Sequence, residues 1–269
     1  MRAWALALLF VPGVASAQVN TEKLRSWDKE GFGGAIDFAM YLRKGNVDLL
    51  TISSGMRLQY VTLHPAETAT STNAEPPPRE VKDLVLAIGS LNFGRRVLDP
   101  YINNGFAHLR WTRMWIPDLG SEVFAQAQYN EFLRVKQRLL LGVGARADVF
   151  ETSWGEVTLG TAPMLEIEDL NDNLGVAEPH TEVVRWSNYL SLKLYMTDPD
   201  ITIVNTLYVQ PRFDEFSDYR FLSEGEISVA VVPDILAFVT SVSIMYDSRP
   251  APTVKRLDTI ISNSIRVTF

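Results

Sequence analysis

Residues 138–149, RLLLGVGARADV, decide the fold of this chain, because apolar and polar side chains alternate along them. Leu139 and Leu141 fall on one face of an extended chain, whereas Arg138 and Arg146 fall on the other. Successive side chains of a β-strand point to opposite faces of its sheet, while a helix repeats every 3.6 residues. The stretch therefore predicts a strand with one apolar face and one charged face.

The same alternation recurs along most of the chain, with turn residues such as Gly45-Asn46 between the segments. No helical period runs longer than two turns, so we expect an all-β protein. Twelve segments alternate in this way, with approximate spans of 33–44, 47–61, 80–94, 103–116, 121–130, 135–150, 155–169, 182–196, 200–212, 219–232, 236–247 and 255–269.

The connections between these segments alternate in length. Tight polar turns at residues 117–120, 151–154, 197–200 and 233–235 alternate with longer polar loops. Short turns at one end and longer loops at the other are typical of outer-membrane β-barrels. The Pro-rich stretch 63–79 breaks this rule, and its Thr, Ala, Pro and Glu content predicts a flexible insertion.

Composition excludes several classes of protein. The 269 residues include no cysteine, which excludes a disulfide scaffold, a Cys-ligated metal and a Cys nucleophile. A pI near 5.1 argues against a nucleic-acid partner, which would require a basic footprint. The mean hydropathy of +0.01 is too low for a helical membrane protein.

The first residues have the form of a targeting segment. Arg2 precedes an apolar run at residues 3–10, and Ala15-Ser16-Ala17 has the small-x-small pattern of a cleavage site. A buried first strand or helix is the alternative interpretation. We expect a signal peptide at residues 1–17, a short N-terminal periplasmic segment at 18–32, and a β-barrel domain at 33–269.

Alternation alone does not say which face is inside, because a soluble barrel turns its apolar face inward and a membrane barrel turns it outward. About eight strands give an interior that side chains can fill, so twelve would leave an apolar lumen empty. Most segments also exceed the ~5–6 residues of soluble strands and reach the ~9–11 residues of a spanning strand. A two-sheet sandwich remains the soluble alternative.

The positions of aromatic residues and of the C-terminus also favour a membrane barrel. Trp115 and Trp154 fall at the short-turn end, whereas Tyr129, Trp186 and Tyr246 fall near the long-loop end. Outer-membrane barrels carry such girdles at both interfaces. We therefore predict an antiparallel transmembrane β-barrel of about twelve strands.

The predicted barrel is closed by a C-terminal strand that ends at Phe269. Ile265, Val267 and Phe269 share a face, which resembles the C-terminal insertion signal that the barrel-assembly machinery reads in bacterial outer-membrane proteins. Ser264 stands where that signal usually has Gly. The resemblance implies the assembly machinery as a partner during biogenesis.

Three stretches carry a family resemblance: NNGFAHLR at 103–110, QPRFDEFSDYR at 210–220 and YDSRPAP at 246–252. They resemble the salt-induced outer membrane protein family, a domain of unknown function in Gram-negative bacteria. The resemblance spans nearly all of the chain after the targeting segment. It implies an outer-membrane barrel, and it implies no agreed activity.

The polar face of the predicted barrel is rich in charge of both signs, which suits a water-filled space. One interpretation is a narrow or closed lumen braced by salt bridges, and the other is a selective pore. The charged residues predicted to line the lumen are Asp37, Arg43, Arg57, Arg110, Arg138, Arg146, Asp148, Glu166, Glu168, Lys193, Arg212, Glu224, Glu226, Asp258 and Arg266.

The loop at 213–219 combines aromatic and acidic residues on the predicted extracellular side. Asp214, Glu215 and Asp218 offer oxygen ligands for a divalent cation, or a cation bridge to lipopolysaccharide. They do not follow EF-hand spacing. The alternative is that these carboxylates pair with Arg212 or Arg220.

An enzyme is the hypothesis from a different class, because some outer-membrane barrels are lipid hydrolases with a Ser–His pair. The three histidines, His64, His108 and His180, are scattered, and no G-x-S-x-G motif accompanies them. Three scattered histidines also do not predict a metal site. We therefore predict no catalytic residue, metal or cofactor.

The sequence predicts a monomer surrounded by outer-membrane lipid and lipopolysaccharide. Its leading predicted function is envelope maintenance or stress adaptation, with a narrow passive pathway for small solutes. A sealed barrel that presents its extracellular loops is the second hypothesis, and a lipid-modifying enzyme is the third.

Overall fold

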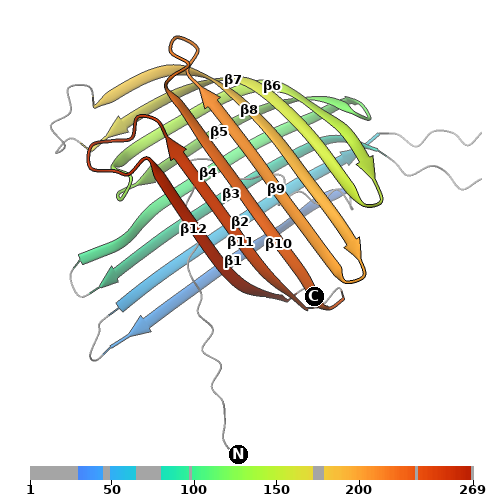
Figure 1. Ribbon diagram of the computed structural model, residues 1–269, viewed down its shortest axis with the longest axis horizontal. Helices are drawn as coiled ribbons and strands as arrows, with labels where there is room; N and C mark the ends of the chain where they lie inside the picture. The colour runs from blue at the N-terminus through green and yellow to red at the C-terminus, as the bar shows by residue number, and fades with distance from the viewer. Residues whose placement is uncertain are drawn as a thin grey trace, which may run out of the picture.

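The computed structural model describes residues 30–44, 49–64, 80–96, 99–171, 179–233 and 236–267 (Figure 1). The regular secondary structure of these residues consists of β-strands only. Among them, no helix has the length and apolar character needed to cross a membrane. The predicted signal peptide, the Gly45-Asn46 turn and most of the Pro-rich stretch lie outside the described residues.

Twelve strands form one sheet in which every neighbouring pair is antiparallel and the spatial order follows the sequence. All twelve predicted segments are confirmed, with ends that differ by four residues or fewer. The strands are β1 Gly31–Arg43, β2 Leu49–Leu63, β3 Val81–Arg96, β4 Asp99–Ile116, β5 Leu119–Asn130, β6 Val135–Thr152, β7 Gly155–Leu170, β8 His180–Thr197, β9 Asp200–Pro211, β10 Tyr219–Val232, β11 Leu236–Asp247 and β12 Leu257–Val267.

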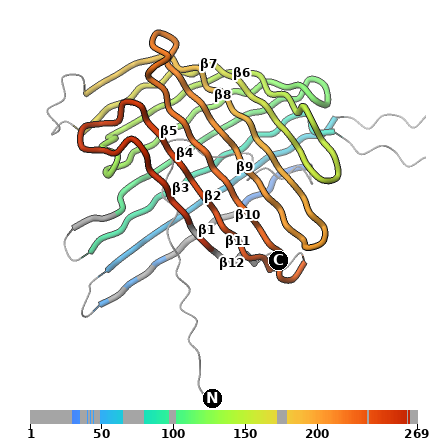
Figure 2. The backbone as a smooth tube through the Cα atoms, in the orientation of Figure 1, coloured from blue at the N-terminus to red at the C-terminus, as the bar shows by residue number. Residues whose placement is uncertain are grey.

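The sheet is strongly curved, so that β8–β12 pass in front of β1–β5 in the view of Figures 1 and 2. Contacts between distant strands confirm the curvature. The hydroxyl of Tyr189 on β8 donates to Glu122 Oε2 on β5 at 3.0 Å. Strands spaced about 4.8 Å apart would hold β5 and β8 roughly 14 Å apart in a flat sheet. The face that carries these side chains is therefore the concave one.

The sheet has two edges in the described part of the chain. There β1 pairs only with β2, and β12 pairs only with β11. Phe269, which was predicted to end the closing strand, lies outside the described residues, as do the side chains of Ile265 and Val267. An all-β antiparallel sheet of twelve strands is thus established, and its closure into a barrel stays a prediction.

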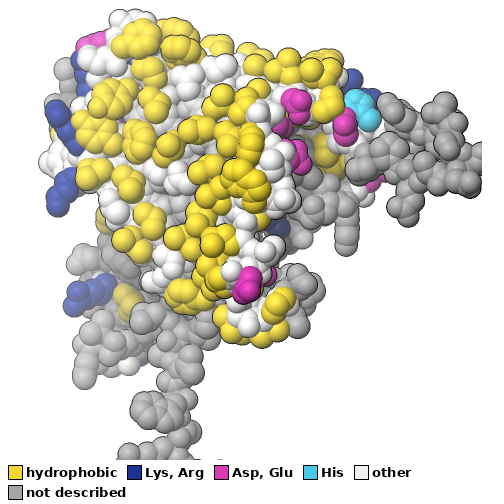
Figure 3. Space-filling model, turned by 45° about the vertical axis from the view of Figure 1, so that its right-hand side comes forward, with side chains coloured by type: hydrophobic (Ala, Val, Ile, Leu, Met, Phe, Trp, Pro, Cys, Tyr) yellow, Lys and Arg dark blue, Asp and Glu magenta, His cyan; other side chains and the backbone are white. Residues whose placement is uncertain are grey.

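The two faces of the sheet differ as the alternation predicts. On β4, His108 and Thr112 are 3% and 1% exposed, whereas Leu109 and Trp111 between them are 52% and 43% exposed. The convex face bears a broad apolar surface, and Figure 3 shows charged side chains mainly near its margins. Exposed apolar residues occur on strand after strand, including Leu91, Val123, Leu141, Val143, Leu159, Leu190, Val209, Ile227, Phe238 and Ile261.

Glycine makes room for an aromatic ring where Tyr189 crosses its neighbouring strand. Gly160 pairs with Tyr189 across β7 and β8. A Cβ atom at Gly160 would lie 2.0 Å from Cε1 of the Tyr189 ring, far inside van der Waals contact. The ring therefore lies over the backbone of β7, from where its hydroxyl reaches Glu122.

We predict that Gly160→Ala lowers the free energy of unfolding by about 1–3 kcal/mol, because the methyl group displaces the Tyr189 ring. Gly89→Ala is the matched control, since the nearest atom to its Cβ would be Phe106 O at 3.8 Å. Urea titration of both variants measures the difference. Equal stability of the two variants would contradict this account of Gly160.

Candidate functional site

The concave face holds two clusters of buried ion pairs, and we treat these as the candidate functional site. The first, the central cluster, surrounds Glu122 on β5. Its carboxylate accepts hydrogen bonds from Arg110 Nη1 at 3.3 Å and Thr112 Oγ1 at 3.0 Å, besides that from Tyr189. Arg110, Thr112 and Glu122 are 2%, 1% and 4% exposed. The carboxylate therefore lies in a nearly closed polar environment that involves three strands.

Arg146 on β6 extends the central cluster. Its guanidinium donates to Asp148 Oδ1 at 2.8 Å and to the Tyr189 hydroxyl at 3.3 Å. Thr158 on β7 donates to the same Asp148 oxygen at 2.6 Å. The guanidinium carbon of Arg110 also lies 5.8 Å from the centre of the Tyr189 ring. Side chains from β4, β5, β6, β7 and β8 thus converge around Tyr189.

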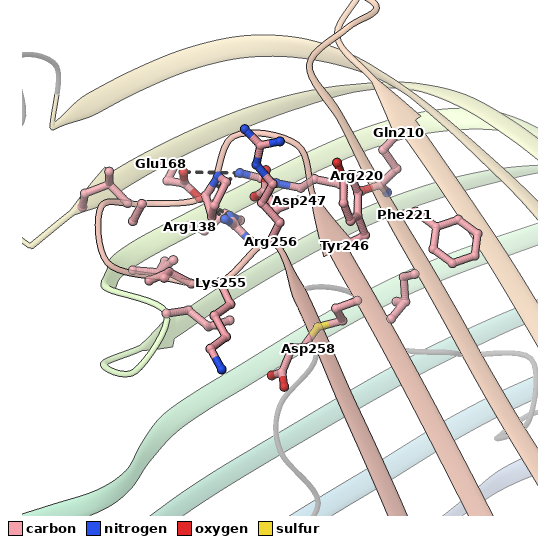
Figure 4. A pocket seen from close by; sticks show the side chains of 18 residues that line it. Arg138, Glu168, Gln210, Arg220, Phe221, Tyr246, Asp247, Lys255, Arg256 and Asp258 are labelled. Carbon is pink, nitrogen blue, oxygen red and sulfur yellow. Dashed lines mark hydrogen bonds and ion pairs between the residues drawn. The ribbon is translucent and has the colours of Figure 1, made fainter.

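The second, the loop-end cluster, lies where β6–β11 approach their longer connections (Figure 4). Arg138 on β6 forms an ion pair with Glu168 on β7. Arg220 on β10 pairs with Glu166, and its Nη2 lies 3.3 Å from Glu168 Oε2. The Nε of Arg220 donates to Asp247 Oδ2 on β11 at 3.0 Å. One guanidinium therefore joins three carboxylates across the concave face.

Arg185 on β8 completes the loop-end cluster. Its Nε donates to Glu166 Oε1 at 3.1 Å, and its Nη1 donates to Asp218 Oδ1 at 3.1 Å. Arg212 reaches the other oxygen of Asp218 at 3.3 Å. A buried charge is costly unless it is paired and hydrogen-bonded, so each arginine depends on its carboxylates.

The charged residues predicted for the polar face differ in how exposed their side chains are to solvent. The buried ones are Arg110, Arg138, Arg146, Glu166, Glu168 and Glu224. The half-buried ones are Arg57, Asp148, Lys193, Arg212 and Glu226, and Asp258 is exposed. The side chains of Asp37, Arg43 and Arg266 lie outside the description.

Several residues of the two clusters are absent from the predicted set, namely Glu122, Arg185, Arg220 and Asp247. The alternation along β5 places Glu122 on the same face as Phe124 and Gln126, so a signal for it existed. Arg185 and Arg220 likewise occupy the polar face of their strands. Asp247 is the last residue of β11, where alternation gives no firm direction.

The acidic loop carboxylates pair with arginines, and Arg212 is the predicted partner of two of them, Asp214 and Asp218. Glu215 pairs instead with Arg249, and among the described residues none of these carboxylates forms an ion pair with Arg220. Arg212 Nη2 lies 2.7 Å from Asp214 Oδ2, and Arg249 Nη1 donates to Glu215 Oε2 at 2.8 Å. These hydrogen bonds lower the pKa of both carboxyl groups, and donation to Asp214 raises the pKa of Arg212. Both carboxylates are therefore ionised and engaged at neutral pH. Asp218 is buried against Arg185 and Arg212.

The histidines lie apart from each other. His108 is buried on the concave face, with its Nδ1 3.2 Å from Gln126 Oε1 and its ring between those of Phe106 and Phe124. His180 is exposed, with Nδ1 2.7 Å from Asp169 Oδ1. The described residues contain no group of three or more His, Cys, Asp or Glu with the geometry to hold a metal.

Comparison with known proteins gives one match. A family model described as "Protein of unknown function, DUF481" matches residues 36–269. No curated protein and no solved structure gave a match. The matched range includes the residues of both clusters.

We predict that Glu166→Gln destabilises the fold by about 3 kcal/mol or more, because Arg185 and Arg220 lose a buried carboxylate. Glu182→Gln is the matched control, since Glu182 is exposed and pairs only with His180 among the contacts described, so it should change stability by less than about 1 kcal/mol. Urea unfolding monitored by circular dichroism measures both. A cost no larger for Glu166 than for Glu182 would refute the structural importance of the loop-end cluster.

Proposed function

Because this chain belongs to the DUF481 family of proteins of unknown function, we propose from its own geometry that it is a bacterial outer-membrane β-barrel. In this proposal it serves in envelope maintenance or stress adaptation, with no more than a narrow passive pathway for small solutes. The observation that carries the proposal is the apolar convex face opposite a concave face of buried ion pairs.

The apolar convex face is larger and more continuous than a soluble protein normally leaves in water. Exposed large apolar side chains recur on β3 to β12, and contiguous apolar surface of this extent normally contacts lipid or another protein. The described strands are 11 to 18 residues long, against the ~9–11 needed to span a bilayer. Lipid contact accounts for both features.

Aromatic residues support the same orientation. Trp115 and Trp154 are 60% and 57% exposed beside the tight turns, and Trp186 is 41% exposed towards the other end. Trp and Tyr favour the two interfaces of a membrane, where an apolar ring meets a hydrated headgroup. Tyr219 and Tyr246 also stack on each other near the longer loops, with ring centres 5.5 Å apart.

In this proposal the sheet closes into a barrel, which an even number of antiparallel strands allows. Twelve antiparallel strands leave β1 and β12 running in opposite directions, so they can pair like their neighbours. Unpaired edge groups would be costly in hydrocarbon, which favours closure in the membrane. A cleaved signal peptide at 1–17, a periplasmic segment at 18–32, and contact with lipopolysaccharide and the assembly machinery complete the proposal.

The clusters on the concave face limit what the interior could conduct. The central cluster joins β4 to β8, and the loop-end cluster joins β7 to β10 and β11. Side chains that bridge distant strands occupy the space through which a solute would pass. Because these side chains fill part of the interior, they favour a narrow pathway. The same observation supports the second candidate, a sealed barrel that presents its loops.

We predict that single cysteines on the convex face are shielded by lipid. The chain contains no native cysteine, so each introduced thiol is unique. In liposomes, Leu141→Cys and Leu192→Cys should react at least tenfold more slowly with a water-soluble maleimide than Asp214→Cys in the exposed loop. Equally fast reaction at all three sites would contradict contact of the convex face with lipid.

We predict that the purified protein has a low conductance in planar bilayers, and that removing a pair of the central cluster raises it. Arg110→Ala combined with Glu122→Ala removes both partners, which avoids leaving one buried charge alone. Larger channel events from this double variant would support the narrow pathway. Absence of events from folded wild type and variant would favour the sealed barrel.

A further inference from the structure

The segment between β11 and β12, residues 248–256, reaches strands on the opposite side of the curved sheet, and we call it the strap (Figure 4). Three of its residues, Pro250, Ala251 and Val254, line one side of a cavity. The other side of this cavity includes Leu133 in the β5–β6 turn, Val135 and Arg138 on β6, and Glu168 and Leu170 on β7. Because β6 and β11 are five places apart in the strand order, the strap crosses the concave side of the sheet at its loop end.

The space between the strap and the opposite strands is small. The cavity measures about 70 Å³, and one water needs roughly 10–15 Å³ of such volume, so it holds about five waters. Val135 and Leu222, which line it from β6 and β10, are 3% and 5% exposed. The strap residues that line the cavity are half-buried, whereas Pro252 and Thr253 between them are exposed. A hydrated solute therefore enters at this point only if the strap moves.

Two contacts outside the cavity hold the strap against the β9–β10 connection. Ser248 N donates to Tyr219 O at 3.1 Å, and Tyr219 N donates to Ser248 Oγ at 2.9 Å. Arg249 Nη1 donates to Glu215 Oε2 at 2.8 Å, and these two side chains are 52% and 41% exposed. An exposed ion pair is weak in water, so the second contact can break while the strands stay paired.

The tip of the strap is a strained turn. Val254 N donates to Ala251 O at 3.0 Å, which closes a turn with Pro252 and Thr253 at its two central positions. Thr253 has a φ of 72°, at a position after Pro where turns of this kind favour Gly or Asn. A β-branched residue is unfavourable in this left-handed conformation, because its Cβ crowds the neighbouring carbonyl oxygen. The strap in its present position therefore carries strain that a displaced strap can release.

We propose that the strap is a gate at the loop-end opening of the sheet. While Arg249 and Glu215 are paired, the strap covers the cavity and the loop-end cluster. When this pair breaks, the strap moves away from β6 and β7 and admits small hydrophilic solutes. Opening exposes Arg138 and Glu168, which carry opposite charges, so the gate selects by size rather than by charge. This inference rests on the passive pathway of the proposed function, and it names the element that limits entry at the loop end.

The reactivity of a single cysteine under the strap tests the gate. Val135→Cys keeps a small apolar side chain, and the chain has no native cysteine. Val239→Cys is the matched control, since Val239 is also buried on the concave face, at 2% exposure, but does not line the cavity. The full mature protein in lipid nanodiscs is treated with a small water-soluble methanethiosulfonate, and mass spectrometry measures the rate of modification.

Glu215→Gln combined with Arg249→Gln should raise the modification rate of the Val135→Cys protein at least fivefold and leave that of the Val239→Cys protein unchanged. Thr253→Asn relieves the strain of the closed strap, so it should lower the Val135→Cys rate at least twofold. His180→Gln combined with Glu182→Gln removes another exposed pair at the loop end, and it should change neither rate.

An equal Val135→Cys rate with and without the Arg249–Glu215 pair would overturn the gate, and so would an equal increase at both reporter sites. The Glu215/Arg249 variant should also conduct more than wild type in planar bilayers, and an unchanged conductance would overturn the role in gating. If the Arg110/Glu122 variant conducts more and the strap variant does not, only the gate fails. If neither variant conducts, the pathway itself fails.

Discussion

Buried charges on the concave face require partners, and in this sheet the partners come from distant strands. Arg220 on β10 reaches Glu166 and Glu168 on β7, and Tyr189 on β8 reaches Glu122 on β5. Each such contact is possible only if the sheet curves. Curvature and charge pairing therefore depend on each other, since a flatter sheet would leave these guanidinium and carboxylate groups unpaired.

The apolar convex face is the other consequence of the same alternation. Where polar side chains occupy one face of a strand, the intervening apolar side chains must occupy the other. In water, so much exposed apolar surface would favour association, whereas in a bilayer it is the stabilising surface. The membrane proposal and the buried ion pairs are thus two results of one sequence pattern.

The strands could be predicted from the sequence because their signal is local. A period of two and polar turns identify each strand, which explains why β10 and β11 were predicted with their observed bounds. The partners of Arg220 could not be predicted in this way. Glu166 lies 54 residues from Arg220 in the chain, and the two meet only because β7 and β10 face each other across the curved sheet.

Contacts between residues far apart in the sequence also explain why the sequence analysis did not predict the role of Glu122. Glu122 lies on an alternating strand but was not recognised, because its importance comes from Tyr189, which crosses from β8 over Gly160. The cavity of about 70 Å³ under the strap, the segment that connects β11 to β12, also depends on how that segment folds back over distant strands. Local alternation assigns a face to each residue, whereas sites require knowledge of curvature and loop path.

Fluorescence quenching by lipids with brominated acyl chains tests the central claim most directly. Trp111 and Trp186 are exposed on the convex face, and Trp115 and Trp154 are exposed beside the tight turns. Trp27, which lies in the proposed periplasmic segment, is first replaced by Phe. The account predicts strong quenching of this reconstituted variant by bromines in the acyl chains and weak quenching by aqueous iodide. Strong quenching by iodide, with none by the brominated chains, would contradict it.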